Sequence, residues 1–173
     1  MLSVAEPRSE AELMERARGL AGLTLGELGA EVGVAVPDEG VRGKGVAGQI
    51  LEKALGATAA SRAEPDFLGL RIELKTIPLG AQGKPKESTF VASISLSAMA
   101  DTDWEQSAVS KKLSKVLFVP VEAASETPLR DRRIGRAYLW TPTGQELAAL
   151  RTDWERLAEM IARGDVEQIT GHL

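Results

Sequence analysis

The order of apolar and polar positions along the chain predicts alternating helices and strands. Apolar residues recur with helical spacing in five segments, 9–20, 24–33, 46–55, 103–115 and 143–161. Four other segments have the composition or the alternation typical of strands, 67–77, 89–97, 116–121 and 137–141. The run 116–121 is nearly all apolar, as expected of a strand covered on both faces. We therefore predict an α/β fold with a mixed central sheet flanked by helices.

Short polar signals mark where these elements begin and end. Three helices are predicted to open with a capping box, in which a hydroxyl and a Glu three residues later cap the first turn: Ser9 with Glu12, Thr24 with Glu27, and Thr143 with Glu146. Segments 34–45 and 56–65 are rich in Gly, Pro and small residues, which favours loops. The segment 80–85 predicts a hairpin turn that pairs strand 67–77 with strand 89–97.

Strand 67–77 carries the chemistry. Side chains alternate between the faces of a strand, so Glu73 and Lys75 share one face, and Asp66 precedes the strand at close range. Two carboxylates and a lysine are the residues that a magnesium-dependent phosphodiesterase needs, since Mg²⁺ prefers oxygen ligands and keeps a substrate phosphate in its shell. The alternative is an ordinary charged pair on an exposed strand face, which contributes a few tenths of a kcal/mol.

Composition narrows the possible functions further. The 173 residues suit a single domain, predicted over 1–173, and no stretch has the length and hydropathy of a membrane span or a signal peptide, so we expect a soluble cytoplasmic protein. The chain has no Cys, which excludes disulfides and thiolate chemistry. Its one histidine, His172, lies next to the C-terminus and is poorly placed for a catalytic triad.

Positive charge is clustered although the net charge is −4. Such clusters are either solvated faces or a track for the phosphates of double-stranded DNA. The basic clusters are Arg42 with Lys44, Lys84 with Lys86, Lys111 with Lys112 and Lys115, and Arg130, Arg132, Arg133 and Arg136.

The segment 43–48 matches the G-x-G-x-x-G pattern of dinucleotide-binding folds, and Asp66 follows at about the distance of a ribose-binding acid. That fold needs a strand leading into the first glycine, and the segment 37–40, Pro-Asp-Glu-Gly, breaks any such strand. In a Walker-type phosphate loop a Ser or Thr follows the lysine, whereas the residue after Lys44 is a glycine. We therefore do not expect a nucleotide cofactor.

Motifs spread over most of the chain resemble the MutH family of methyl-directed mismatch repair endonucleases, whose restriction-endonuclease-like fold belongs to the PD-(D/E)-x-K group. The residues that carry this resemblance lie in these segments: Thr24-Leu25-Gly26-Glu27-Leu28, Leu51-Glu52, Ala54-Leu55-Gly56-Ala57, Asp66-Phe67, Glu73-Leu74-Lys75-Thr76-Ile77-Pro78, Thr89-Phe90-Val91, Trp104-Glu105, Lys112-Leu113, Pro120-Val121-Glu122, Arg132-Arg133-Ile134-Gly135, Leu139-Trp140, Asp153-Trp154-Glu155 and Ile169-Thr170.

The resemblance implies nicking of the unmethylated strand at hemimethylated GATC sites, with Mg²⁺ as cofactor and MutL as activator. It implies that Asp66, Glu73 and the carbonyl of Leu74 hold the metal, and that Lys75 orients or deprotonates the attacking water. Glu52 would complete the acidic cluster and Lys112 would lie near the scissile phosphate. DNA contacts are expected from Lys44 and from residues of the basic clusters: Lys84, Lys86, Arg132 and Arg133.

The family continues beyond the last matching residues, Ile169-Thr170, with segments that read the DNA bases and sense methylation, whereas this chain stops at Leu173. The catalytic set is therefore expected to be complete, and target selection is the weaker expectation. Two alternatives remain: a restriction endonuclease of the same fold that recognises GATC, and a catalytically silent module that binds DNA or MutL. We expect a monomer.

Overall fold

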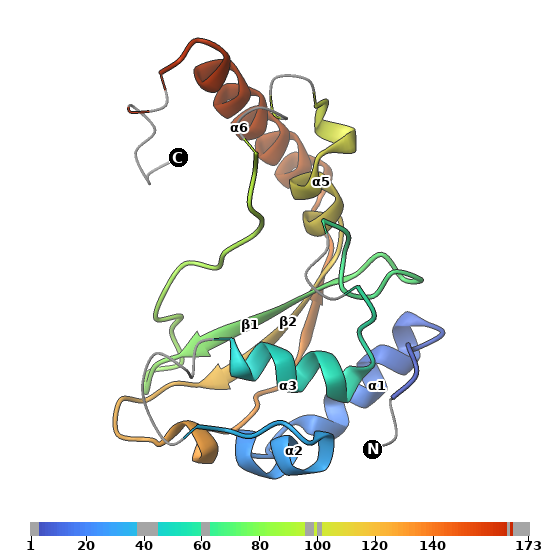
Figure 1. Cartoon of the computed structure of the whole chain (residues 1–173), viewed down its shortest axis with the longest axis vertical. Coiled ribbons are helices and arrows are strands. Elements are labelled where there is room, and N and C mark those ends of the chain that lie inside the picture. The colour runs from blue at the N-terminus through green and yellow to red at the C-terminus, as the bar shows by residue number, and fades with distance from the viewer. Residues whose placement is uncertain are drawn as a thin grey trace.

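The computed structural model of the chain describes residues 4–37, 45–59, 63–95, 99, 102–165 and 167. Its strands form a mixed sheet in the order β1-β2-β3, with β1 parallel to β2 and β3 antiparallel to β2. The predicted α/β class with a mixed sheet and flanking helices is confirmed (Figure 1). In chain order the elements are α1 (Glu10–Leu20), α2 (Leu25–Val32), α3 (Val46–Leu55), β1 (Glu73–Leu79), the 3₁₀ turn η2 (Trp104–Gln106), α5 (Ala108–Leu113), β2 (Val116–Glu122), the 3₁₀ turn η3 (Leu129–Asp131), β3 (Tyr138–Trp140) and α6 (Gly144–Ala162).

The helices begin where their polar caps predict. Thr24 and Glu27 form a complete capping box at α2, and Thr143 and Glu146 form another at α6. At α1 the predicted capping box is only half formed: the Ser9 hydroxyl accepts a hydrogen bond from the N–H of Glu12, but the Glu12 carboxylate accepts from the N–H of Arg8 instead of Ser9. These caps satisfy backbone donors that the first turn of a helix leaves without partners. No helix of the described part of the chain is long and apolar enough to cross a membrane.

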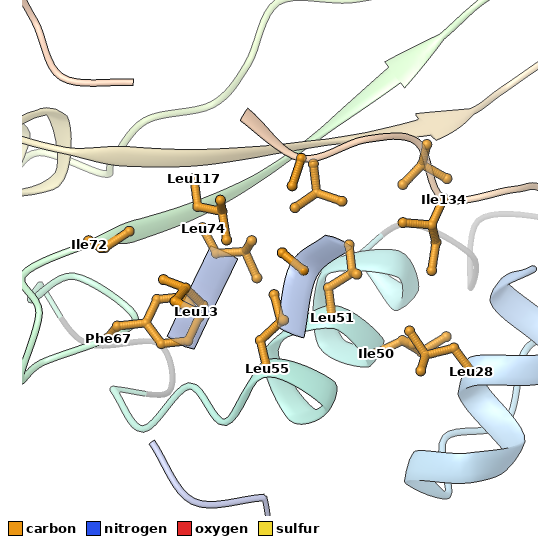
Figure 2. Packing of buried hydrophobic residues seen from close by; sticks show 14 of the residues in the cluster. Leu13, Leu28, Ile50, Leu51, Leu55, Phe67, Ile72, Leu74, Leu117 and Ile134 are labelled. Carbon is orange, nitrogen blue, oxygen red and sulfur yellow. The ribbon is translucent and has the colours of Figure 1, made fainter. Parts of the chain in front are cut away.

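The main core lies between one face of the sheet and helices α1, α2 and α3 (Figures 1 and 2). Leu51 and Leu55 of α3 are fully buried and face the strands, where Leu74 of β1 and Leu117 of β2 are also buried. Burial of a leucine side chain contributes roughly 1.5–3 kcal/mol, so this layer fixes α3 firmly against β1. The start of β1 is therefore anchored from one side.

A second, smaller core lies at the start of β1 and β2, on the other side of the molecule from α1–α3 (Figure 1). Trp104 of η2 and Trp154 of α6 are each 5% exposed, and their ring centroids are 6.3 Å apart. Met99 is buried with them. This cluster joins α6 to the segment that leads into α5, and so holds α5 beside the beginning of the sheet.

Strand β1 is shorter at its start than the predicted strand 67–77. The chain makes a tight reversal before β1, in which the N–H of Phe67 bonds to the carbonyl of Ile72 at 2.9 Å. Arg71 has a φ of 57°, a left-handed conformation that a non-glycine residue adopts only rarely. The prediction was wrong here because the alternation of apolar side chains runs on through residues 67–72, where the backbone makes a turn that the side-chain pattern does not reveal.

The predicted strand 89–97 is also wrong over its described part. The turn 80–85 is confirmed, because the Gly80 N–H bonds to the Lys84 carbonyl and Leu79 pairs with Pro85. Beyond it, residues 89–95 form no strand, and β1 pairs with β2 along its full length instead. Phe90 is 69% exposed, so the apolar residues of this segment gain no core contact that would hold a strand in place.

The predicted helix 103–115 is divided at Ser107 into η2 and α5. The Ser107 side chain accepts a hydrogen bond from the N–H of Ser110 at 3.0 Å, so it caps α5 as a new helix. It also donates to the carbonyl of Trp104 at 2.7 Å, which holds the end of η2. The division changes the direction of the chain and sets the position of the lysines on α5.

Candidate active site

The tight reversal before β1 brings Asp66 back against the start of the strand. Its Oδ2 accepts a hydrogen bond from the backbone N–H of Leu74 at 2.8 Å. Its carbonyl accepts from the N–H groups of Thr58 and Ala59 at 3.0 and 3.2 Å. The segment after α3 therefore holds the Asp66 backbone, and β1 itself holds the carboxylate. Although the strand starts later than predicted, Asp66 still lies close to Glu73, as predicted.

Glu73 lies at the first position of β1 and is only 2% exposed. Two lysines neutralise it. The Nζ atom of Lys75 lies 2.8 Å from Oε1, and the Nζ atom of Lys112 lies 2.9 Å from Oε1 and 3.1 Å from Oε2. A buried carboxylate without such partners would be strongly unfavourable. The structure thus brings together the three predicted residues Glu73, Lys75 and Lys112.

The charges around Asp66 are not balanced in the same way. Burial raises the pKa of this carboxyl to about 6, the N–H of Leu74 lowers it, the negative charges of Glu73 and Glu52 raise it, and the positive charge of Lys112 lowers it. The predicted acidic cluster of Glu52, Asp66 and Glu73 is therefore close enough for its members to repel one another. Surplus negative charge at a half-buried position favours binding of a cation.

A cavity of about 500 Å³ lies next to the start of β1, and Asp66, Glu73 and Lys112 are not among the residues that line it. Glu52 of α3 and Lys75 of β1 line it, so two of the predicted catalytic side chains face a space that can admit a substrate group. The opposite wall is the segment that follows the hairpin turn. The lining consists of Gly45, Gly48, Glu52, Leu74, Lys75, Thr76, Pro78, Glu87, Ser88, Thr89 and Phe90.

The donor set suits Mg²⁺. The predicted ligands are the carboxylates of Asp66 and Glu73 and the backbone carbonyl of Leu74, at the start of β1, and all are hard oxygen donors of the kind that Mg²⁺ prefers. Within the described residues, no group of three or more His, Cys, Asp or Glu side chains is arranged to hold a metal ion, so Glu52 does not join Asp66 and Glu73 as a third ligand. Water and substrate phosphate would complete the shell, as is usual for this ion.

Sequence reasoning missed the part played by the segment after the hairpin. The Nζ atom of Lys75 donates to the carbonyl of Val91 at 3.4 Å, and Glu87 and Phe90 line the cavity. Phe90 is 69% exposed, so its ring is accessible to a ligand in the cavity. The sequence offered one signal, the motif Thr89-Phe90-Val91 of the family resemblance, but the segment was predicted only as a strand and given no role in the site.

Of the predicted DNA-binding residues that the structure describes, none lines the cavity. Lys84 lies exposed in the hairpin turn, and Lys86 donates to the carbonyl of Ala123 at 3.0 Å. Arg132 donates to the carbonyl of Thr127 at 3.2 Å, and Arg133 lies beside Glu122, at the opposite end of the strands from Glu73. Lys44 lies outside the described residues. Their role in DNA binding stays a prediction.

Comparisons with known proteins agree with the motifs. The family model described as "DNA mismatch repair enzyme MutH" matches residues 55–153. The chain is 49% identical to the DNA mismatch repair protein MutH of Haemophilus ducreyi over 97% of this chain and 74% of that protein. It is 50% identical to the MutH of Vibrio campbellii and 51% identical to that of Shewanella amazonensis, in each case over 95% of this chain and 73% of the relative. The resemblance predicted from the motifs is confirmed.

Proposed function

Because the chain belongs to the MutH family of DNA mismatch repair enzymes, we propose that it is a Mg²⁺-dependent endonuclease that nicks the unmethylated strand of hemimethylated GATC sites. The enzyme class follows from the family: this is a nuclease of DNA mismatch repair. The metal, the target sequence and the choice of strand are the proposed parts.

One arrangement supports the proposed chemistry more than any other. The carboxylates of Asp66 and Glu73 both lie at the start of β1, close enough to interact electrostatically, and Lys75 of the same strand lines the cavity. Asp66 comes from the reversal before β1, and Glu73 and Lys75 come from β1 itself. Together they place charged groups at a largely buried position, where a protein without a binding site would have apolar residues. Buried charges with a raised carboxyl pKa, placed beside a cavity, are typical of catalytic sites.

The residues then take separate roles. Asp66, Glu73 and the Leu74 carbonyl would hold Mg²⁺, which when bound supplies Lewis-acid activation of the phosphate. Lys75 would orient or deprotonate the attacking water, and its contact with the Val91 carbonyl restricts where its ammonium group can lie. Its positive charge would also stabilise charge that develops on the phosphate.

The remaining charged residues would act on the substrate or on the acidic cluster. Glu52 lines the cavity and contributes negative charge near Asp66, so we assign it to the acidic cluster. We place Lys112 near the scissile phosphate. Backbone contacts to double-stranded DNA are proposed for the residues of the basic clusters: Lys44, Lys84, Lys86, Arg132 and Arg133.

Target selection and activation rest on the family alone. The chain spans about three quarters of the length of the MutH relatives, 74% and 73% for the two from Haemophilus ducreyi and Vibrio campbellii. We propose GATC recognition, sensing of hemimethylation and activation by MutL for this chain. We further propose that it acts as a monomeric single domain in the cytoplasm.

A nicking assay tests the proposal. A plasmid with one hemimethylated GATC site is incubated with the protein, with and without Mg²⁺ and MutL, and the nicked strand is mapped. We expect a single nick on the unmethylated strand that requires Mg²⁺ and is accelerated by MutL. Cleavage of both strands without MutL would indicate a restriction endonuclease, and DNA binding with no cleavage under any condition would indicate a silent binding module.

A further inference from the structure

The ammonium group of Lys112 donates hydrogen bonds to both carboxylate oxygens of Glu73. Its Nζ atom lies 2.9 Å from Oε1 and 3.1 Å from Oε2, and the side chains of Lys112 and Glu73 are 12% and 2% exposed. Lys75 binds Oε1 as well, at 2.8 Å. The carboxylate that is proposed to hold the metal is therefore already paired with two ammonium groups.

A divalent metal and these ammonium groups compete for the same atoms. A magnesium ion would lie about 2.1 Å from a carboxylate oxygen, which places it next to an ammonium group that touches the same oxygen. Two like charges at that separation in a site with little water repel strongly. Metal binding to Glu73 therefore requires at least one lysine to move away from the carboxylate.

Lys112 is the lysine with more freedom to move. Lys75 is part of β1, two residues from Glu73, and also donates to the carbonyl of Val91. Lys112 belongs to the six-residue helix α5, outside the sheet, although its side chain is no more exposed than that of Lys75, 12% against 17%. Its long side chain can turn toward the solvent without disturbing the sheet.

We propose that Lys112 is an internal counter-cation of Glu73, which neutralises the carboxylate while the metal is absent and leaves it when the metal binds. This inference rests on the proposed function, since it concerns the same metal site. Lys112 thereby lowers the affinity of the site for Mg²⁺ and stabilises the metal-free fold. Once displaced, its ammonium group is free to contact a DNA phosphate, so metal binding and DNA binding would favour each other.

The substitution Lys112→Met separates this role from a purely structural one, because Met keeps the apolar stem and loses the charge. Lys111→Met is the matched control. Lys111 is the adjacent residue on α5 and pairs with Glu64 at 3.0 Å, so its loss changes the net charge equally and leaves Glu73 paired. Each protein, with its full chain and without DNA, is titrated with Mg²⁺ by calorimetry and melted with and without Mg²⁺.

We expect Lys112→Met to bind Mg²⁺ about tenfold more tightly than the wild type, the size of effect that a neighbouring opposite charge has on a carboxylate. Its metal-free form should melt at a lower temperature, and Mg²⁺ should raise its melting temperature more than that of the wild type. Lys111→Met should change the Mg²⁺ affinity by less than about twofold, because its charge lies on a separate, more exposed pair.

The opposite direction is tested by Lys112→Arg. A guanidinium can pair with both oxygens of Glu73 in a planar arrangement, so this variant should fold and bind Mg²⁺ more weakly than the wild type. It also serves if Lys112→Met fails to fold.

Mg²⁺ binding of equal strength in the wild type, Lys112→Met and Lys112→Arg would contradict the proposal that Lys112 and the metal compete for Glu73. It would not affect the proposed endonuclease function. Absence of Mg²⁺ binding in all of them would contradict the metal site itself, and with it both proposals.

Discussion

The two ends of strands β1 and β2 use positive charge in different ways. At the start of the strands, Lys75 and Lys112 bind the buried carboxylate of Glu73. At the far end, Arg133 is exposed and donates to the carbonyl of Gly22 at 2.7 Å. Both ends look alike in the sequence, as basic residues close to acidic ones.

The difference lies in what each cation contacts. A lysine on a buried carboxylate determines the charge of a site, whereas an arginine on an exposed carbonyl holds a loop and leaves most of its charge toward solvent. We therefore expect substitutions at the Glu73 end to change the rate of the chemistry. Substitutions at the Arg133 end should change the stability of the protein and its affinity for DNA.

The largest effect is expected for Lys75→Ala. The loss of the group that activates water and stabilises developing charge should lower the single-turnover nicking rate by about a thousandfold or more. DNA affinity should stay within about twofold of the wild type, as measured by fluorescence anisotropy, because one half-buried lysine contributes little to the total of the backbone contacts. Equal loss of nicking and of DNA binding would contradict the assigned role.

Asp66→Asn should abolish nicking and yet stabilise the metal-free protein near neutral pH. The pKa of Asp66 is raised from 3.8 to about 6, so the folded state disfavours the charged carboxylate, and this cost is fully present above pH 6. The cost disappears as the pH falls from about 6 to about 4. After allowance for partial exposure, the gain in unfolding free energy at pH 7.5 should be on the order of 1 kcal/mol.

Urea unfolding of wild type and Asp66→Asn at pH 7.5 and pH 4, without metal, measures this difference. The variant should be more stable at pH 7.5 and nearly equal at pH 4. A variant that is less stable at pH 7.5 would mean that the hydrogen bond to the Leu74 N–H outweighs the burial of charge. At Mg²⁺ concentrations below saturation, nicking by the wild type should fall as the pH drops, because protons compete with the metal for Asp66, whose raised pKa in the metal-free protein favours the protonated form.

Glu52→Gln should have a smaller effect. Loss of a residue that interacts with the metal ligands but not with the metal typically lowers metal affinity or activity 10- to 100-fold. We expect the nicking rate to fall about tenfold. Because the Glu52 charge raises the pKa of Asp66, the acidic limb of the pH–rate profile should move to lower pH. A slower enzyme with an unchanged pH profile would show that Glu52 does not act through Asp66.

The smallest effect is expected for Arg133→Ala, at the other end of the strands. The lost hydrogen bond to the Gly22 carbonyl should lower the unfolding free energy by about 0.5–1.5 kcal/mol. If Arg133 also contacts a phosphate, DNA binding should weaken and the slope of log K against log salt should decrease by about 1. An Arg133→Ala variant with wild-type affinity and salt slope would restrict Arg133 to a structural role.

Local signals in the sequence predicted much of this structure. The capping residues Thr24 and Thr143 placed two helix starts correctly, and the apolar run 116–121 predicted β2. The spacing of Glu73 and Lys75 predicted their contact, because strand alternation is a local rule.

Long-range features could not be derived from such rules. The pairing of Lys112 with Glu73 spans 39 positions and depends on how the second core holds α5 beside β1. The family resemblance placed Lys112 near the scissile phosphate and did not predict its pairing with Glu73. The reversal at Arg71 and the irregular segment 89–95 were missed because backbone conformation and the lack of a core contact, not side-chain pattern, determine them.

Calorimetric titration of Mg²⁺ into the wild type and into Asp66→Ala tests most directly whether the Glu73 end of the sheet is a metal site. We expect a saturable binding heat for the wild type, with no DNA present, and its loss in Asp66→Ala. The variant's circular dichroism spectrum should match that of the wild type, which shows that the fold is retained. Absence of binding heat in both proteins, or equal heat in both, would contradict the site.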